Sequence, residues 1–242
     1  EAELYGRIEA SALISAFLEV AERRHLDLGC ATELIKGVLS DLESVLVEDD
    51  VELLRYCYRV AGTVGLMMCA VLGVTEKQAL PYAVDLGVAM QQTNICRDVA
   101  EDARLGRVYL PRTRLQFHNT TPEAVLQGKA RRADIARVVG ELLTLGDAYY
   151  RSADDGMQFI PARSRVAIMV ASRVYRAIGV KLQANGSDAL AGRTIVSWRG
   201  KSRWGAKALA DASRPRVTGW FPVPPHDRNL HLALDGLPGA HR

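Results

Sequence analysis

Apolar residues recur at helical spacing along nearly the whole chain of 242 residues, and no segment shows the strict alternation that is typical of a half-buried strand. The periodicity predicts helices over about 1–24, 28–46, 50–73, 76–104, 121–153 and 163–184. A chain of this length can bury a substantial core within one domain. We therefore predict an all-α fold, formed by a single helical bundle.

The C-terminal end of the chain is rich in proline, which breaks regular structure. The prolines from residue 213 onward are Pro215, Pro222, Pro224, Pro225 and Pro238. We divide the chain into a helical domain over 1–212 and a Pro-rich tail over 213–242. The tail is expected to be poorly ordered, or packed irregularly on the surface, and to be dispensable for chemistry.

Charge is nearly balanced, with 31 Lys and Arg residues against 28 Asp and Glu residues. This balance does not indicate a nucleic-acid partner. Two clusters of basic residues are interpreted as solvated faces rather than as anion sites. They are Lys129, Arg131, Arg132 and Arg137, and Arg193, Arg199, Lys201 and Arg203.

The four cysteines form no CxxC pair, and three of them lie within apolar runs. They are predicted to be buried thiols in a reducing compartment rather than disulfide or zinc ligands. The five histidines are scattered, three of them in the tail (His226, His231 and His241), so no histidine metal site is expected. The longest apolar run, Val60 to Val74, is too short to span a bilayer. We predict a cytoplasmic protein.

The helix predicted over 76–104 carries a row of polar side chains on the side that should meet the core. At 100° per residue, five residues share an arc about 80° wide that adjoins the apolar arc. They are Gly87, Gln91, Asn94, Asp98 and Asp102. A second set is expected to point elsewhere, as an exposed face. Its members are Gln92, Thr93, Arg97, Glu101 and Arg104.

Asp98 and Asp102 are one helical turn apart, so their carboxylates repel each other. Burying them costs several kcal/mol each unless a cation or a set of donors compensates. Together with the side-chain oxygen of Asn94, they suit a hard cation such as Mg²⁺, which takes the rest of its shell from water and phosphate. The alternative is an exposed stripe in which the two carboxylates pair with Arg97, Arg104 or a neighbouring helix.

Two glycines interrupt the helix predicted over 50–73, within the segment YCYRVAGTVG from Tyr56 to Gly65. A glycine inside a helix costs about 1 kcal/mol relative to alanine. Such glycines indicate either a close approach of two helices or room for a ligand.

Three segments resemble the squalene/phytoene synthase family, and the first resembles the bacterial phytoene synthases most. They are YCYRVAGTVG from Tyr56, NICRDVAEDARLGRVYLP from Asn94, and PARSRVAIMVASRVYRAIG from Pro161. The resemblance implies an isoprenoid synthase bundle with a central cavity. It implies a prenyltransferase of carotenoid biosynthesis that uses Mg²⁺, or Mn²⁺ in its place. The expected reaction joins two geranylgeranyl diphosphates head to head, through a cyclopropylcarbinyl diphosphate, to phytoene.

The resemblance also implies roles for individual residues. Asp98 and Asp102 bind the metal that holds a diphosphate, with Asn94 as a further ligand, and Arg97 contacts a phosphate. Tyr56 lies near the reacting carbons, and Tyr175 donates a hydrogen bond to a phosphate. The residues that match the wall of the prenyl tunnel are Val60, Val64, Gly65, Gly87 and Gln91. For Tyr56, Tyr175 and the two valines, simple packing in the core is the alternative.

The family's first aspartate-rich motif has no counterpart in this chain, since no DxxxD pattern precedes residue 41 and Asp49-Asp50 is interpreted as a helix cap. Either residues upstream of Glu1 are missing, which the intact second motif favours, or the protein is a non-catalytic relative that acts in assembly. We expect the chain as given not to catalyse the reaction by itself. A squalene or dehydrosqualene synthase using farnesyl diphosphate is a further alternative. The expected partners are prenyl diphosphates and, for product release, the surface of a membrane.

Overall fold

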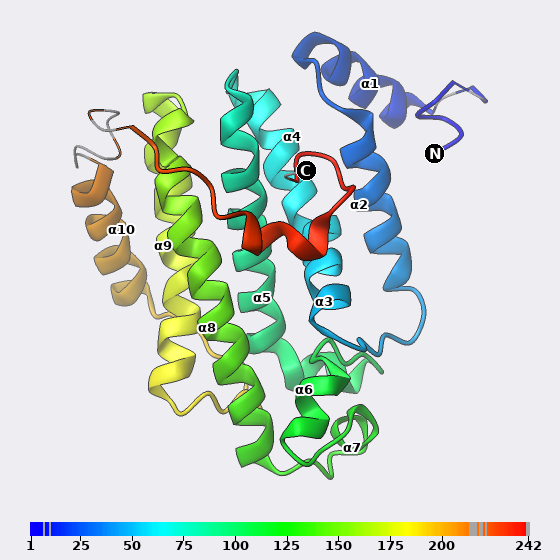
Figure 1. Cartoon of the computed structure of the whole chain (residues 1–242), viewed down its shortest axis with the longest axis vertical. Coiled ribbons are helices and arrows are strands. Elements are labelled where there is room, and N and C mark those ends of the chain that lie inside the picture. The colour runs from blue at the N-terminus through cyan, green and yellow to red at the C-terminus, as the bar shows by residue number, and fades with distance from the viewer. Residues whose placement is uncertain (7, 10, 213–216, 218–219, 221, 241–242) are drawn as a thin grey trace.

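The computed structural model describes residues 1–242 except 7, 10, 213–216, 218–219, 221 and 241–242. The described residues form a bundle of α-helices without strands, as predicted (Figure 1). The helices are α1 (Ala12–Arg24), α2 (Leu28–Ser40), α3 (Asp50–Cys57), α4 (Thr63–Leu72), α5 (Leu80–Arg104), α6 (Arg112–Phe117), α7 (Pro122–Leu126), α8 (Arg132–Gly156), α9 (Ala162–Ala184) and α10 (Trp198–Ala212). A π-helical turn, Tyr58–Gly62, joins α3 to α4.

Helix α5 lies at the centre of the bundle, where α4, α8 and α9 pack around it (Figure 1). The side chains of Gln92 and Thr93 are therefore buried, with 1% and 2% of their surface exposed, and the hydroxyl of Thr93 lies 3.1 Å from that of Tyr150 on α8. The prediction that these two residues lie on an exposed face was wrong. The periodicity of one helix cannot show that a second helix covers its polar side.

Most predicted helices are confirmed, and the differences have local causes. The segment 121–153 divides into α7 and α8 because Gly128 adopts a left-handed conformation, with φ of 65°. The cap predicted at Asp49 is present, since its side chain accepts a hydrogen bond from the amide of Glu52. Thr121 caps α7 in the same way by accepting a hydrogen bond from the amide of Ala124. Helix α10 was missed because it contains two glycines and several charged residues, which weaken the apolar pattern.

The four cysteines are buried and unpaired, as predicted. Among the described residues, no helix is both long enough and apolar enough to cross a membrane.

Residues 222–240, here called the C-terminal segment, cross the bundle over α5 and α3 (Figure 1). Leu234 is fully buried and belongs to the main core. The carbonyl oxygens of Pro224 and Pro238 accept hydrogen bonds from Tyr82 and Tyr58, at 2.6 and 2.5 Å. The expectation of a surface tail is corrected for these residues. Prolines exclude an α-helix here, but they leave carbonyls free for the tyrosines of the bundle.

Candidate active site

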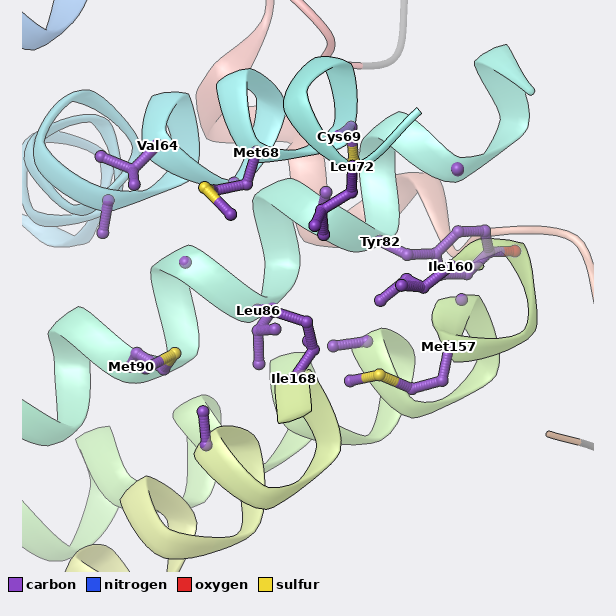
Figure 2. Close-up of a pocket in the computed structure, with 18 of the residues that line it drawn as sticks. Val64, Met68, Cys69, Leu72, Tyr82, Leu86, Met90, Met157, Ile160 and Ile168 are labelled. Carbon is purple, nitrogen blue, oxygen red and sulfur yellow. The ribbon is translucent and has the colours of Figure 1, made fainter. Parts of the chain in front are cut away.

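An apolar cavity of about 340 Å³ lies between α4, α5, α9 and the end of α8 (Figure 2). Val64, Met68 and Leu72 on α4 face Leu86 and Met90 on α5 across it. Val64 and Met68 are also 40% and 39% exposed, so the cavity reaches the surface beside α4. An apolar cavity with few polar groups is suited to a hydrocarbon chain.

The two ends of the cavity differ in polarity. Asn94 and Tyr175 stand at one end, and Tyr82, Phe159 and Ile160 close the other. Between Asn94 and Tyr82, α5 rises by about 18 Å. A long apolar ligand with a polar head would therefore lie along α5 with its head towards Asn94.

Gly65 and Gly87 line this cavity, but contact between helices explains why each is glycine. A Cβ atom on Gly65 would lie 2.4 Å from the backbone oxygen of Ala83, and one on Gly87 would lie 2.4 Å from that of Ala61. Neither position can accept any side chain without moving a helix. Of the two explanations given for the glycines within 50–73, close approach accounts for Gly65, and it accounts for Gly87 as well.

Beyond Asn94, α5 continues the polar row towards its C-terminus with Asp98 and Asp102. The side chain of Asp98 is 16% exposed and accepts a 2.8 Å hydrogen bond from the Nε atom of Arg97. Arg193, which precedes α10, also pairs with Asp98, at 3.1 Å. The Oδ1 atom of Asn94 is buried and accepts no hydrogen bond. The carboxylate of Asp98 thus pairs with arginines, as the alternative interpretation proposed for both carboxylates, but Asp98 and Asp102 do not form an exposed stripe.

The carboxyl group of Asp102 is strained electrostatically. Burial, followed by the nearby charge of Asp98, raises its pKa from 3.8 to about 6. Arg107 opposes this increase only in part, and Asp41 adds to it. A divalent cation would relieve the repulsion between Asp98 and Asp102. It would also be a binding partner for Asn94 Oδ1, which accepts no hydrogen bond. The three oxygen donors therefore fit Mg²⁺ on chemical grounds.

Replacing Asp102 by Asn is expected to stabilise the metal-free protein at neutral pH. Because the folded pKa lies above 3.8, the folded state holds the proton more tightly, and stability falls as pH rises from about 4 to 6. Removing the charge should restore about 1 kcal/mol after allowance for solvent screening, or about 2–4 °C in Tm. Thermal melts at pH 4.5 and 7.5 without metal would measure it. A variant that melts lower than the wild type at pH 7.5 would contradict this reading.

Arg97 and Arg193 occupy places that the sequence did not predict. The placement of residues at 100° intervals put Arg97 on the exposed face of the helix. Its side chain is nevertheless only 14% exposed, because it folds back onto Asp98. Arg193 belongs to a cluster that was interpreted as a solvated face. The basic residues near Arg193 in the sequence were the one feature that could have indicated an anion-binding role for it. Two guanidinium groups beside the carboxylates provide forked donors suited to a phosphate.

Tyr56 lies outside the wall of the cavity, in a neighbouring group of polar residues. Its hydroxyl donates to a carboxylate oxygen of Asp41 at 3.0 Å, and Tyr109 donates to the other at 2.7 Å. The two tyrosine rings stack with centroids 4.7 Å apart. Burial, with Tyr109 and Asp41 beside it, raises the pKa of Tyr56 far above its usual range. Asp41 and Tyr109 were not identified as candidates from the sequence.

The structure brings together most, but not all, of the candidate residues. Those that line the apolar cavity are Val60, Val64, Gly65, Gly87, Asn94 and Tyr175. Those that lie outside its lining are Tyr56, Gln91, Arg97, Asp98 and Asp102. Gln91 accepts a hydrogen bond from Asn94 at 3.3 Å. The arrangement is an apolar cavity continued by a row of amide, carboxylate and guanidinium groups.

Comparisons with known proteins match most of this chain to one family. The family model described as squalene/phytoene synthase matches residues 3–201, and so ends before the C-terminal segment. The 15-cis-phytoene synthase of Enterobacter agglomerans is 38% identical over 208 residues, which cover 86% of this chain and 70% of that protein. The phytoene synthase of Thermus thermophilus is 38% identical over 202 residues, covering 82% and 68%.

Solved structures show the same fold at lower identity. A dehydrosqualene synthase in complex with ligand superposes with a TM-score of 0.75 at 23% identity, covering 86% of this chain and 74% of that one. A squalene synthase from Alicyclobacillus acidocaldarius superposes with a TM-score of 0.70 at 19% identity, covering 77% and 70%. These matches, together with the helical bundle, show that the chain belongs to the squalene/phytoene synthase family.

Proposed function

We propose that this protein is a prenyltransferase that joins two geranylgeranyl diphosphates head to head to form phytoene. The observation that carries the proposal is the continuity between the apolar cavity and the row Asn94, Asp98 and Asp102 on one helix. A prenyl chain would lie in the cavity, with its diphosphate beside the carboxylates. The curated relatives that bear the name phytoene synthase favour the longer substrate over farnesyl diphosphate.

Each group in the site has a part in this proposal. Arg97 and Arg193 bind the phosphate oxygens, and Tyr175 donates a hydrogen bond from the polar end of the cavity. Apolar side chains exclude water from the allylic cation that forms when the diphosphate departs. Tyr56, held by Asp41 near the polar row, presents an aromatic ring there, and cation–π attraction to such a ring is worth about 0.5–2 kcal/mol.

Mg²⁺, or Mn²⁺ in its place, would be held by Asp98, Asp102 and the free oxygen of Asn94. When bound, it neutralises the charge that develops on the leaving diphosphate. Ionised carboxylates are required for this binding, so Asp102, with its pKa of about 6, should make the affinity for Mg²⁺ fall in mildly acidic solution.

Attachment to a membrane surface is supported by α10. Trp198 and Leu209 on this helix are 79% and 59% exposed, and Arg199 and Arg203 are exposed beside them. An exposed apolar face with basic flanks binds anionic lipid surfaces. We expect the protein to sediment with anionic phosphatidylglycerol vesicles, and Trp198→Ala to weaken this at least about 3-fold. Equal sedimentation of both proteins would exclude α10 as the contact.

The test of the enzymatic proposal is incubation of the protein with Mg²⁺ and either geranylgeranyl or farnesyl diphosphate, followed by identification of the hydrocarbon. A thermal melt with each diphosphate measures binding separately from turnover. Phytoene as the main product supports the proposal, and squalene or dehydrosqualene from farnesyl diphosphate would replace it with the alternative. Binding without turnover would agree with the expectation that this chain, in which the first aspartate-rich motif has no counterpart, does not catalyse the reaction by itself. If the chain neither binds a diphosphate nor turns it over, a non-catalytic role is favoured.

A further inference from the structure

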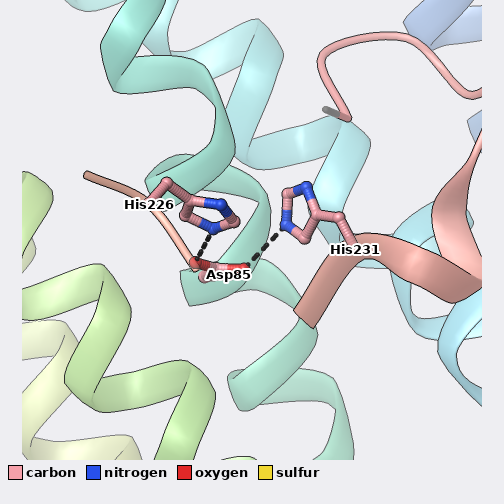
Figure 3. Close-up of side chains that lie close together, drawn as sticks. All are labelled: Asp85, His226 and His231. Atoms are coloured by element: carbon pink, nitrogen blue, oxygen red, sulfur yellow. Dashed lines mark hydrogen bonds and ion pairs between the residues drawn. The ribbon is translucent and has the colours of Figure 1, made fainter. Parts of the chain in front are cut away.

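Three side chains converge on one buried point on α5, away from the polar row of the candidate active site (Figure 3). The carboxylate of Asp85 lies on α5, and both imidazoles come from the C-terminal segment. The Nε2 atoms of His226 and His231 each lie 2.8 Å from a different oxygen of Asp85. The hydroxyl of Ser152 on α8 donates to the same carboxylate at 2.5 Å. The cluster therefore joins three parts of the chain that are far apart in sequence.

The carboxylate of Asp85 lies in surroundings where its negative charge would be stabilised by a cation. The side chain of Asp85 is fully buried, and those of His226 and His231 are only 2% and 1% exposed. Within the described part of the chain, neither a lysine nor an arginine pairs with Asp85. Burying a carboxylate in this way is costly unless a cation or a set of donors compensates its charge.

The donor set is that of a transition-metal site. Two imidazoles and one carboxylate form one of the common three-ligand sets for Zn²⁺. Their donor atoms all lie within 4.8 Å of one another, so small rotations bring them to a common centre. Ser152 stands beside the carboxylate, where it can orient that ligand. A set containing two imidazoles is poorly suited to Mg²⁺, which prefers oxygen.

We propose that Asp85, His226 and His231 bind a divalent transition-metal ion of the Zn²⁺ class, which clamps the C-terminal segment onto α5. This site is separate from Asp98 and Asp102, since the thirteen residues from Asp85 to Asp98 correspond to about 20 Å along α5. Its role is structural, because the point is enclosed and does not meet the apolar cavity's polar end. Metal binding would then contribute directly to the stability of the fold.

A hydrogen-bonded cluster without metal is the competing explanation, because two imidazole N–H groups and a serine hydroxyl can satisfy one carboxylate. Glutamine distinguishes the two. Its amide N–H occupies nearly the place of a histidine Nε2–H and can donate to Asp85, but it does not replace imidazole as a metal ligand. His226→Gln and His231→Gln therefore keep the hydrogen bonds while removing the proposed site.

The experiment uses the complete chain after treatment with a chelator. Co²⁺ is added as a spectroscopic probe, since a low-coordinate site with imidazole ligands gives visible absorption bands. Zn²⁺ is then titrated against the Co²⁺ signal, and melting is recorded with and without Zn²⁺. The variants are His226→Gln, His231→Gln and Asp85→Asn, with His118→Gln as the control, because His118 pairs with Glu141 far along the chain.

We expect one Co²⁺ per chain, displaced by Zn²⁺, and a Tm that rises with Zn²⁺ concentration. Both glutamine variants should melt like the metal-free wild type but bind Zn²⁺ at least about 100-fold more weakly, while His118→Gln binds normally. The absence of Co²⁺ bands and of any Zn²⁺ effect on wild-type melting would overturn the proposal. So would unchanged Zn²⁺ affinity in both glutamine variants. None of these measurements depends on prenyltransferase activity.

Discussion

Replacing Asp98 by Asn is expected to lower turnover of geranylgeranyl diphosphate by at least about 10²-fold. The substitution keeps the size of the side chain but removes the charge that a divalent cation and the two flanking arginines require. Arg97 and Arg193 both bond to this carboxylate, so its loss frees them as well. Initial rates of the full-length protein at saturating Mg²⁺, with hydrocarbon analysis, would measure the effect.

Glu101→Gln is the matched control for this prediction. It removes one negative charge from the same helix, near the same Arg193, but Glu101 is 53% exposed and lies 3.9 Å from that arginine. We expect its turnover to change by no more than about 3-fold. A Mg²⁺-dependent rise in Tm should persist in Glu101→Gln and disappear in Asp98→Asn. Near-normal turnover of Asp98→Asn would refute the metal assignment.

Replacing Gly87 by Ala is expected to reduce the free energy of unfolding by at least about 3 kcal/mol. The added methyl group would lie 2.4 Å from the backbone oxygen of Ala61, and backbone cannot rotate away as a side chain can. The helices must therefore separate along the wall of the cavity. This corresponds to a fall in Tm of at least about 6 °C, measurable by circular dichroism.

Gly140→Ala is the control for this substitution. Gly140 lies within α8, where a Cβ atom would meet the side chain of Ser187 at an ordinary distance of 3.4 Å. Its better helix propensity should stabilise the protein by up to about 1 kcal/mol. If Gly87→Ala melted like the wild type and only hindered a long substrate, room for the ligand would explain this glycine and the packing argument would fail.

Sequence alone determined most of the helices and the row of polar residues on α5. Both depend on contacts within a few residues, so periodicity and caps were sufficient. The resemblance in YCYRVAGTVG and NICRDVAEDARLGRVYLP also identified the family, because these motifs are long. The prediction of a poorly ordered or surface tail failed for residues 222–240, since the bonds of Pro224 and Pro238 to Tyr82 and Tyr58 join residues more than a hundred positions apart.

Only the tertiary structure decided which charges meet and which glycines are obligatory. Arg193 reaches Asp98 across ninety-five positions of sequence, and His231 reaches Asp85 across 146. Helical periodicity contains no information about such distant partners. Likewise, the sequence allowed Gly65 and Gly87 to provide either room for a ligand or close packing of two helices. The position of the facing backbone decided for close packing. The sequence specified which face of each helix is apolar, but the packing of one helix against another decided what each face meets.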